Sequence, residues 1–205
     1  MIIITGDHGV SLGEQGYYGH GMPPYEEQIH VPLIIKFPEN EHSDVTIEQP
    51  VNHIDILPTI YDFMGIEGGT KNFGESLIPA IEQGKDLERP VYATRSTPPG
   101  GEDWTYREGP YKYMLFGEVK NICVEGKNIK NIDETYESYS EKLFNLEKDP
   151  KESTNIIKEE YEKARELREK LCEIYRIGHE NRYEPEKTEL TDATEEKLRE
   201  LGYLD

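Results

Sequence analysis

"MIIITGDHGVSLGEQGYYGHG", residues 1–21, joins a short β-branched run to an acid and a histidine. The run at residues 2–5 predicts a buried strand of a parallel or mixed sheet. In open α/β sheets, ligand sites lie just beyond the carboxyl ends of the strands. Asp7 and His8 follow this strand directly, so we expect them at such a position. The glycine-rich residues 6–22 show no helical period and predict a loop that can approach a ligand closely.

The side chains of Asp7 and His8 allow two interpretations. A carboxylate and a neutral imidazole together suit a divalent cation, although two ligands do not complete a site. Alternatively, Asp7 caps the loop and His8 hydrogen-bonds nearby backbone, and the spacing alone favours this second interpretation. His20 lies thirteen positions after Asp7 between two glycines. It is either a proton carrier close to an anion or an ordinary loop histidine.

The rest of the chain predicts two further regions. Residues 31–37 form a second buried strand. Asp55 is expected to cap a helix that ends at Gly65, and residues 76–84 contain a helical turn. We expect His30 and His53 to be structural and His42 to be exposed.

From Pro90 onward, short aromatic and β-branched runs predict a small antiparallel sheet. Residues 117–140 are polar and predict a long hairpin loop. Apolar positions recurring every three or four residues predict a helix over 157–176, ended by Gly178. A last short helix is predicted between about residues 192 and 202 from its capping residues.

Composition limits the partners that this chain can have. Lys and Arg total 23 against 42 Asp and Glu, a net charge of −19, so the chain should repel nucleic acid and anionic membranes. An anionic substrate would need a metal ion or a local cationic site. Cys123 and Cys172 lack zinc-site spacing and are expected to be two unpaired thiols. The absence of a signal peptide favours the cytoplasm, but it says nothing about export if Met1 is not the natural start.

Several stretches together resemble the sulfatase family of the alkaline phosphatase superfamily. "TGDHGVSLGEQGYYGHGMPPYEEQIHVPLIIKFP" is similar to a family stretch with T-x-D-H/N-G, L-G-E-H-G, Y-E-E and R-V-P-L-I-I. "PVNHIDILPTIYDFMGI" resembles S-H-x-D-x-x-P-T followed by glycine, and "YKYML" and "EKLFNLEKDPKESTNI" resemble the C-terminal sheet. "EEKLRELGYL" resembles a common family terminus, so the likeness spans nearly the whole chain.

The resemblance implies a partial alkaline-phosphatase-like α/β fold. It comprises the end of the central mixed sheet (residues 1–89) and a small antiparallel C-terminal sheet with a packed helix (residues 90–205). It implies that Asp7 and His8 are ligands of one divalent cation, usually Ca²⁺, with Mg²⁺ or Mn²⁺ as alternatives. His20 falls where many members carry a lysine that grips the sulfate and the leaving-group oxygen. Gln15 stands in place of a common histidine, and His30 in place of a common arginine. Neither is assigned a catalytic role.

The family's nucleophile does not occur in this chain. Members use a formylglycine made from Cys or Ser within C/S-x-P-x-R, and neither cysteine stands in that pattern. The resemblance therefore implies the C-terminal part of a hydrolase of small-molecule or saccharide sulfate esters, inactive on its own and able to self-associate through exposed sheet. The alternatives are a phosphodiesterase or phosphonate monoester hydrolase of the same superfamily, or a non-catalytic structural or binding fragment.

Overall fold

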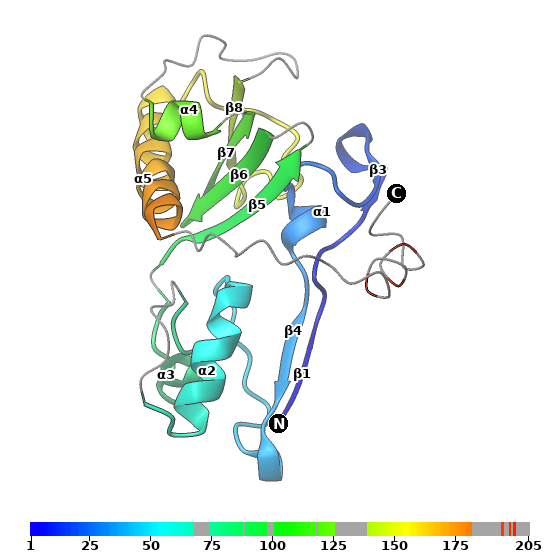
Figure 1. Ribbon diagram of the computed structural model, residues 1–205, viewed down its shortest axis with the longest axis vertical. Coiled ribbons are helices and arrows are strands. Elements are labelled where there is room, and N and C mark those ends of the chain that lie inside the picture. The colour runs from blue at the N-terminus through cyan, green and yellow to red at the C-terminus, as the bar shows by residue number, and fades with distance from the viewer. Residues whose placement is uncertain are drawn as a thin grey trace.

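The structure is a computed structural model (Figure 1). It describes residues 1–67, 74–87, 89–97, 101–117, 119–125 and 139–181, together with residues 194, 197 and 199. These residues form two parts, one built on a strand pair and one on a four-stranded sheet (Figure 1). A two-stranded ribbon, formed by β2 (Ser11–Leu12) and β3 (Tyr18–Gly19), and a short helix, α1 (Glu26–Ile29), lie against the larger sheet.

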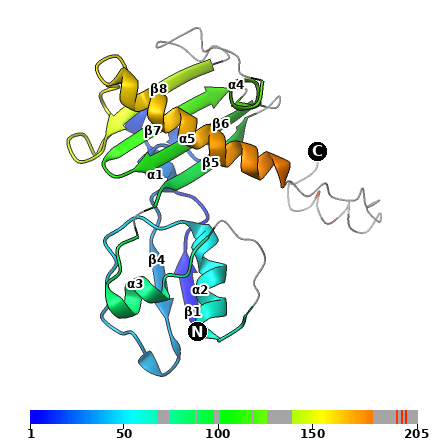
Figure 2. The same cartoon turned by 90° about the vertical axis from the view of Figure 1, so that its left-hand side faces the viewer.

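The strand pair consists of β1 (Ile2–Thr5) and β4 (Leu33–Lys36), which run antiparallel with Ile3 opposite Ile35. One face is covered by α2 (Ile56–Phe63) and α3 (Ile78–Gln83), which lie in front of the strands in Figure 2. The other face leaves apolar side chains more than half exposed, namely Ile2, Ile4 and Ile34. Both predicted strands are confirmed, but their predicted burial is wrong because no element among the described residues covers this face.

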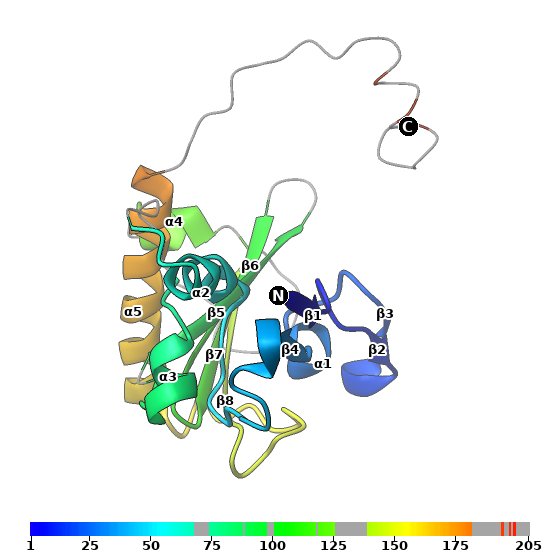
Figure 3. The same ribbon diagram turned by 90° about the horizontal axis from the view of Figure 1, so that it is seen from below.

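The larger sheet is antiparallel and has the order β5-β6-β7-β8. Its strands are β5 (Val91–Thr97), β6 (Gly101–Glu108), β7 (Tyr111–Gly117) and β8 (Tyr139–Asn145). α5 (Tyr161–Glu180) packs on one face, while α1 and the ribbon lie on the other (Figure 3). A large apolar cluster joins α5 to its face of the sheet, and a smaller one lies under Tyr25, just before α1. The predicted C-terminal antiparallel sheet with a packed helix is confirmed.

The long helix differs from its prediction at both ends. α5 begins at Tyr161, because residues 157–159 form a turn that still buries Ile157 in the core. It continues through Gly178 to Glu180. A glycine lowers helix stability by only about 1 kcal/mol relative to alanine, so one more turn is tolerated.

Asp55 has a different role from the predicted helix cap. A short 3₁₀ helix, η3 (His53–Asp55), precedes α2, and Asn52 caps it in a reciprocal arrangement with Asp55. The backbone N–H of Asn52 donates to Asp55 Oδ2 over 2.7 Å. The Asp55 side chain is fully buried and pairs with both terminal nitrogens of Arg89. Gly65, with φ of +64°, ends α2 as predicted.

The two cysteines form a disulfide, which corrects the expectation of two unpaired thiols. Part of the predicted hairpin loop is a helix, α4 (Val119–Cys123), and it packs against α5. This contact brings Cys123 to Cys172 with a Cα–Cα distance of 4.8 Å. The pairing depends on helix packing across 49 residues and could not be read from cysteine spacing. Residues 126–138 of the predicted loop and most of the predicted last helix lie outside the described residues.

Two other short 3₁₀ helices among the described residues are η1 (Glu14–Gly16) and η2 (Pro38–Asn40). Within the part of the chain that the structure describes, no helix combines the length and the apolar character needed to cross a bilayer.

Candidate functional site

Asp7 and His8 lie where β1 ends, on the loop that leaves the strand pair. The His8 N–H donates to Asp7 Oδ1 over 3.0 Å, and His8 Nδ1 lies 2.8 Å from the carbonyl oxygen of Gly9. A neutral ring must carry its proton on the nitrogen that faces a carbonyl, so Nε2 of His8 keeps a free electron pair. This Nε2 lies 3.9 Å from Asp7 Oδ2, and both side chains are exposed.

This pair of donor atoms fits a divalent cation as two of its ligands. Metal–oxygen and metal–nitrogen bonds of about 2.0 to 2.6 Å allow two atoms 3.9 Å apart to share one ion. The structure also contains local hydrogen bonds of the kind expected if Asp7 and His8 only stabilise the loop. They involve Asp7 Oδ1 and His8 Nδ1. No group of three or more His, Cys, Asp or Glu side chains within the described ranges could hold a metal by itself. Asp7 and His8 by themselves therefore do not complete a metal site.

A close backbone approach fixes the loop after His8. The N–H of Gly9 donates to the carbonyl oxygen of Gln28 at 2.7 Å. A Cβ atom at Gly9 would lie only 2.1 Å from the carbonyl oxygen of Glu27, so no other residue fits without moving α1. The glycine that follows the acid–histidine pair is thus required by packing and holds His8 near α1.

The ribbon of β2 (Ser11–Leu12) and β3 (Tyr18–Gly19) brings His20 back to the end of β1. The ring centroids of His8 and His20 are 5.1 Å apart. Gln28 supports the ribbon, because its amide nitrogen donates to Ser11 Oγ at 2.7 Å and to the Gly19 carbonyl at 3.1 Å. The structure therefore gathers Asp7, His8 and His20 around one exposed position.

The other histidines differ in their surroundings. Nε2 of His53 lies 3.2 Å from Thr5 Oγ1, so His53 is an exposed neighbour of the end of β1. Sequence reasoning missed this proximity, although His53 stands inside one of the family-like stretches. The side chain of His30 is 79% exposed, beside Glu26. His42 packs edge-on against Phe37 and is only 21% exposed, so its predicted exposure is wrong.

A buried charge cluster ties α1 to the larger sheet. Lys112 on β7 is completely buried, and its Nζ lies 2.9 Å from Glu26 Oε1 and 2.8 Å from Glu152 Oε1. The N–H of Glu26 also donates to Glu152 Oε2 at 2.7 Å. Burial raises the pKa of Glu152 above its ordinary value. Burial acts the same way on Glu26, but the nearby positive charges, led by Lys112, lower its pKa overall.

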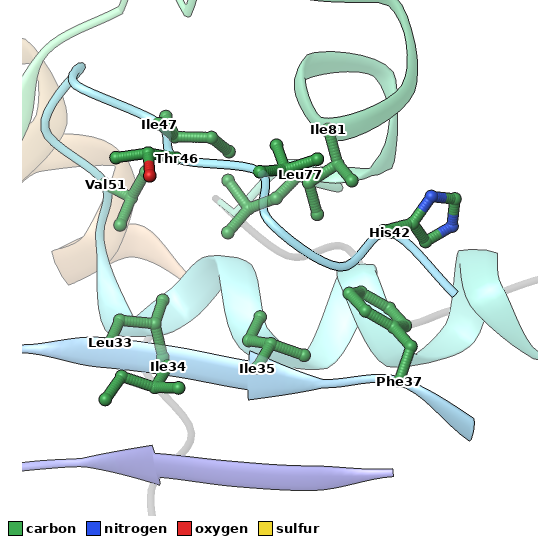
Figure 4. A pocket seen from close by; sticks show the side chains of 11 residues that line it. Leu33, Ile34, Ile35, Phe37, His42, Thr46, Ile47, Val51, Leu77 and Ile81 are labelled. Atoms are coloured by element: carbon green, nitrogen blue, oxygen red, sulfur yellow. The ribbon is translucent and has the colours of Figure 1, made fainter. Parts of the chain in front are cut away.

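An apolar cavity of about 340 Å³ lies elsewhere, beside β4 and below α3 (Figure 4). Its lining includes Leu33, Ile35, Ile47, Leu77 and Ile81. Most side chains that line it are apolar, with His42 and Thr46 as the polar ones, and Asp7, His8 and His20 do not line it. The cavity is therefore separate from the candidate site.

Sequence comparison relates this geometry to known proteins. Residues 1–66 match the model of the sulfatase family. An N-acetylglucosamine-6-O-sulfatase of Bacteroides thetaiotaomicron is 28% identical over 93% of this chain and 32% of its own length. An arylsulfatase of Clostridium perfringens is 29% identical over 80% of this chain and 31% of its own length. The chain thus spans about a third of these relatives.

Solved structures agree with the sequence comparison. A protein in complex with D-glucosamine-2-N,6-O-disulfate is 26% identical with a TM-score of 0.62, covering 88% of this chain and 35% of its own. A phosphonate monoester hydrolase of Agrobacterium radiobacter, 22% identical, has a TM-score of 0.65 and covers 85% of this chain and 34% of its own. This second likeness shows the fold. The chain is therefore related to the sulfatase family and has the alkaline-phosphatase-like fold over the part that it spans.

Proposed function

We propose that these residues belong to a metal-dependent hydrolase of sulfate esters. The observation that carries this proposal is the convergence of His8 and His20, with ring centroids 5.1 Å apart, beside the exposed carboxylate of Asp7. Relatives named as sulfatases across most of the chain support it. The substrate class proposed is a small-molecule or saccharide sulfate ester, in keeping with the saccharides named for two of the proteins that this chain resembles.

Asp7 and His8 would hold the cation, through Oδ2 and Nε2. Ca²⁺ is the first candidate, with Mg²⁺ and Mn²⁺ as alternatives. When bound, the cation supplies positive charge that polarises the nucleophile and neutralises the sulfate. This charge matters here because a chain with a net charge of −19 otherwise repels an anionic substrate.

His20 would donate a proton to the leaving-group oxygen. An imidazole can carry a proton near neutral pH, and the exposed His20 ring lies 5.1 Å from the His8 ring, centroid to centroid. Where a lysine would be cationic over a wide pH range, a histidine is cationic only at lower pH.

The nucleophile is expected to be a formylglycine outside this chain, by the family resemblance. We propose that the 205 residues comprise part of the catalytic domain, 1–89, and a C-terminal subdomain, 90–205. The start of β5 at Val91 and the separate core around α5 support this boundary. The disulfide between Cys123 and Cys172 argues for an oxidising compartment and against the cytoplasm.

An activity assay tests this function. The product of the complete open reading frame that contains these residues is assayed with an aryl sulfate and with an aryl phosphate diester, each with Ca²⁺, Mg²⁺ or Mn²⁺. We expect metal-dependent sulfate hydrolysis, and no turnover by the 205-residue chain alone. Faster phosphate diester hydrolysis would favour the phosphodiesterase or phosphonate hydrolase alternative. Loss of both activities would favour a non-catalytic module.

A second measurement tests the metal ligands in this chain directly. Mn²⁺ is added to the chain, and broadening of its histidine ring proton resonances is followed by NMR. We expect the ring resonances of His8 and His20 to broaden first. In Asp7→Asn, about ten times more Mn²⁺ should be needed for the same broadening, which corresponds to about 1.4 kcal/mol of binding free energy. Asp44→Asn, which changes another exposed aspartate, is the control. Equal broadening in both variants would remove Asp7 from the ligand set.

A further inference from the structure

The loop that carries His20 has little support of its own. Its ribbon contains only two residue pairs, Ser11 with Gly19 and Leu12 with Tyr18. Five of its residues have positive φ angles, namely Gly13, Gln15, Gly16, Gly19 and Gly21. Four of these are glycines, which lose the most conformational entropy when they are ordered. The position of His20 must therefore be fixed by contacts from outside the loop.

Arg95, on the edge strand β5, makes one such contact right beside His20. Its Nη1 donates to the carbonyl oxygen of Gly21 at 2.5 Å. Its Nη2 pairs with Asp103, the residue opposite it on β6. The side chains of Arg95 and Asp103 are only 18% and 3% exposed, so the guanidinium is held firmly from the side of the sheet.

Gln15 provides a second anchor at the other end of the same loop. Its side-chain amide donates to the carbonyl oxygens of Lys151 at 2.7 Å and Glu152 at 2.9 Å. These acceptors follow β8 and belong to the C-terminal region, as Arg95 does. His20 thus lies between two points at which the larger sheet region holds the loop.

We propose that Arg95 is a positioning residue, which holds His20 against His8 by binding the Gly21 carbonyl while Asp103 orients its guanidinium. A planar guanidinium suits this task because two of its nitrogens can donate in fixed directions to two different acceptors. This inference rests on the proposed role of His20 and extends it, since it makes the C-terminal sheet responsible for the geometry of the site.

A purely structural role for Arg95 would predict the same ion pair but no effect on His20. The matched control is Arg168 on α5, which is 21% exposed and pairs with Glu141, itself 2% exposed. Arg168 thus resembles Arg95 in burial and in partner. It links α5 to β8, on the face of the sheet opposite α1 and the ribbon (Figure 3).

The test measures the NOE between the ring protons of His8 and His20 in the metal-free chain. We expect Arg95→Met to reduce it at least threefold, while Arg168→Met leaves it at the wild-type intensity. Circular dichroism and Trp104 fluorescence verify that both variants fold. If Arg95→Met does not fold, the NOE is measured in Arg95→Lys instead. Lysine keeps the positive charge but lacks the planar guanidinium that donates to two acceptors in fixed directions. A reduced NOE in that variant supports the proposal.

An NOE at wild-type intensity in the folded Arg95→Met chain, or in Arg95→Lys where that variant decides, would overturn the proposal. Mn²⁺ broadening of the same resonances separates this failure from failure of the proposed function. If the wild-type chain shows the NOE but Mn²⁺ does not affect His8, the metal site is wrong while the positioning role of Arg95 can still be upheld. If Mn²⁺ broadens His8 but Arg95→Met changes nothing, only the positioning role is wrong.

Discussion

The four-stranded sheet and the strand pair use similar apolar residues but bury them very differently. In the four-stranded sheet, Tyr113 and Leu115 have no exposed surface. In the strand pair, Ile2 and Ile4 are 56% and 58% exposed. The first sheet is covered by α5 on one face and by α1 with its ribbon on the other (Figure 3). The strand pair has a cover on one face alone among the described residues.

Because of this difference, most of the buried core and the residues of the candidate site lie in different parts of the molecule. The larger sheet and α5 contain most of the buried core, whereas Asp7 and His8 follow the sparsely covered strand pair. The buried Lys112 cluster and the Arg95 contact join the two. We infer that the larger sheet is the folded support on which the loops of the candidate site are held. Self-association through the exposed face of the strand pair stays a prediction.

The largest effect is expected where the two regions meet. Lys112→Met removes the cation between Glu26 and Glu152 and leaves the buried carboxylate of Glu152 and the partly buried one of Glu26 without it. Breaking a buried ion pair from one side costs about 3 to 5 kcal/mol. Urea unfolding should show a loss of this size, whereas Lys163→Met, which removes a helix-surface ion pair with Glu166, should change stability by less than about 0.5 kcal/mol. Equal losses in the two variants would mean that the cluster does not join the regions.

A comparison of apolar truncations measures the difference in burial directly. Leu167→Ala, in the core under α5, should reduce the free energy of unfolding by about 2 to 5 kcal/mol. Ile4→Ala, on the exposed face of β1, should change it by less than about 0.5 kcal/mol and should reduce association in sedimentation velocity. A large loss for Ile4→Ala without any change in association would show that this face is covered within one chain.

A smaller effect concerns pH. Burial raises the pKa of Glu152 in the folded chain above its model-compound value of 4.5. Above pH 4.5 the folded state therefore keeps a proton that the unfolded state has lost, so this group's contribution to stability falls as the pH rises through the raised pKa. Glu152→Gln should flatten this part of the pH profile of unfolding. The pKa of Glu26 is lowered, so its contribution to stability should instead be lost as the pH falls below 4.5. Glu26→Gln should remove this loss at low pH. Identical profiles for wild type and Glu152→Gln would contradict the assignment.

Local patterns in the sequence predicted most elements of the fold. The apolar runs of β1 and β4, the glycine after α2 and the repeat of α5 each depend on neighbours within a few residues. The contacts that the sequence did not predict join residues far apart in the chain. The sequence predicts that Asp55 caps a helix, whereas in the structure its carboxylate binds Arg89, 34 positions later. The disulfide and the half-buried environment of His42 likewise depend on packing between separate elements.

The candidate site shows the same division. The pairing of Asp7 with His8 follows from their adjacency, and the glycines around His20 indicate a loop that can turn back. Nothing near His20 in the sequence indicates that Arg95 holds the next carbonyl group, because that contact spans 74 positions. Gln15 had no assigned role, and its anchoring to Lys151 and Glu152 also required the folded structure.

The disulfide has a topological consequence. By joining Cys123 to Cys172, it closes residues 123–172 into a covalent ring that contains all of β8 and the first half of α5. A single peptide bond broken anywhere inside this ring leaves the two fragments attached. Such a nicked chain would migrate as one species under non-reducing conditions and separate into two after reduction. The disulfide therefore keeps β8 and α5, which belong to the region supporting the candidate site, in one covalent molecule after a single peptide bond in the ring is cleaved.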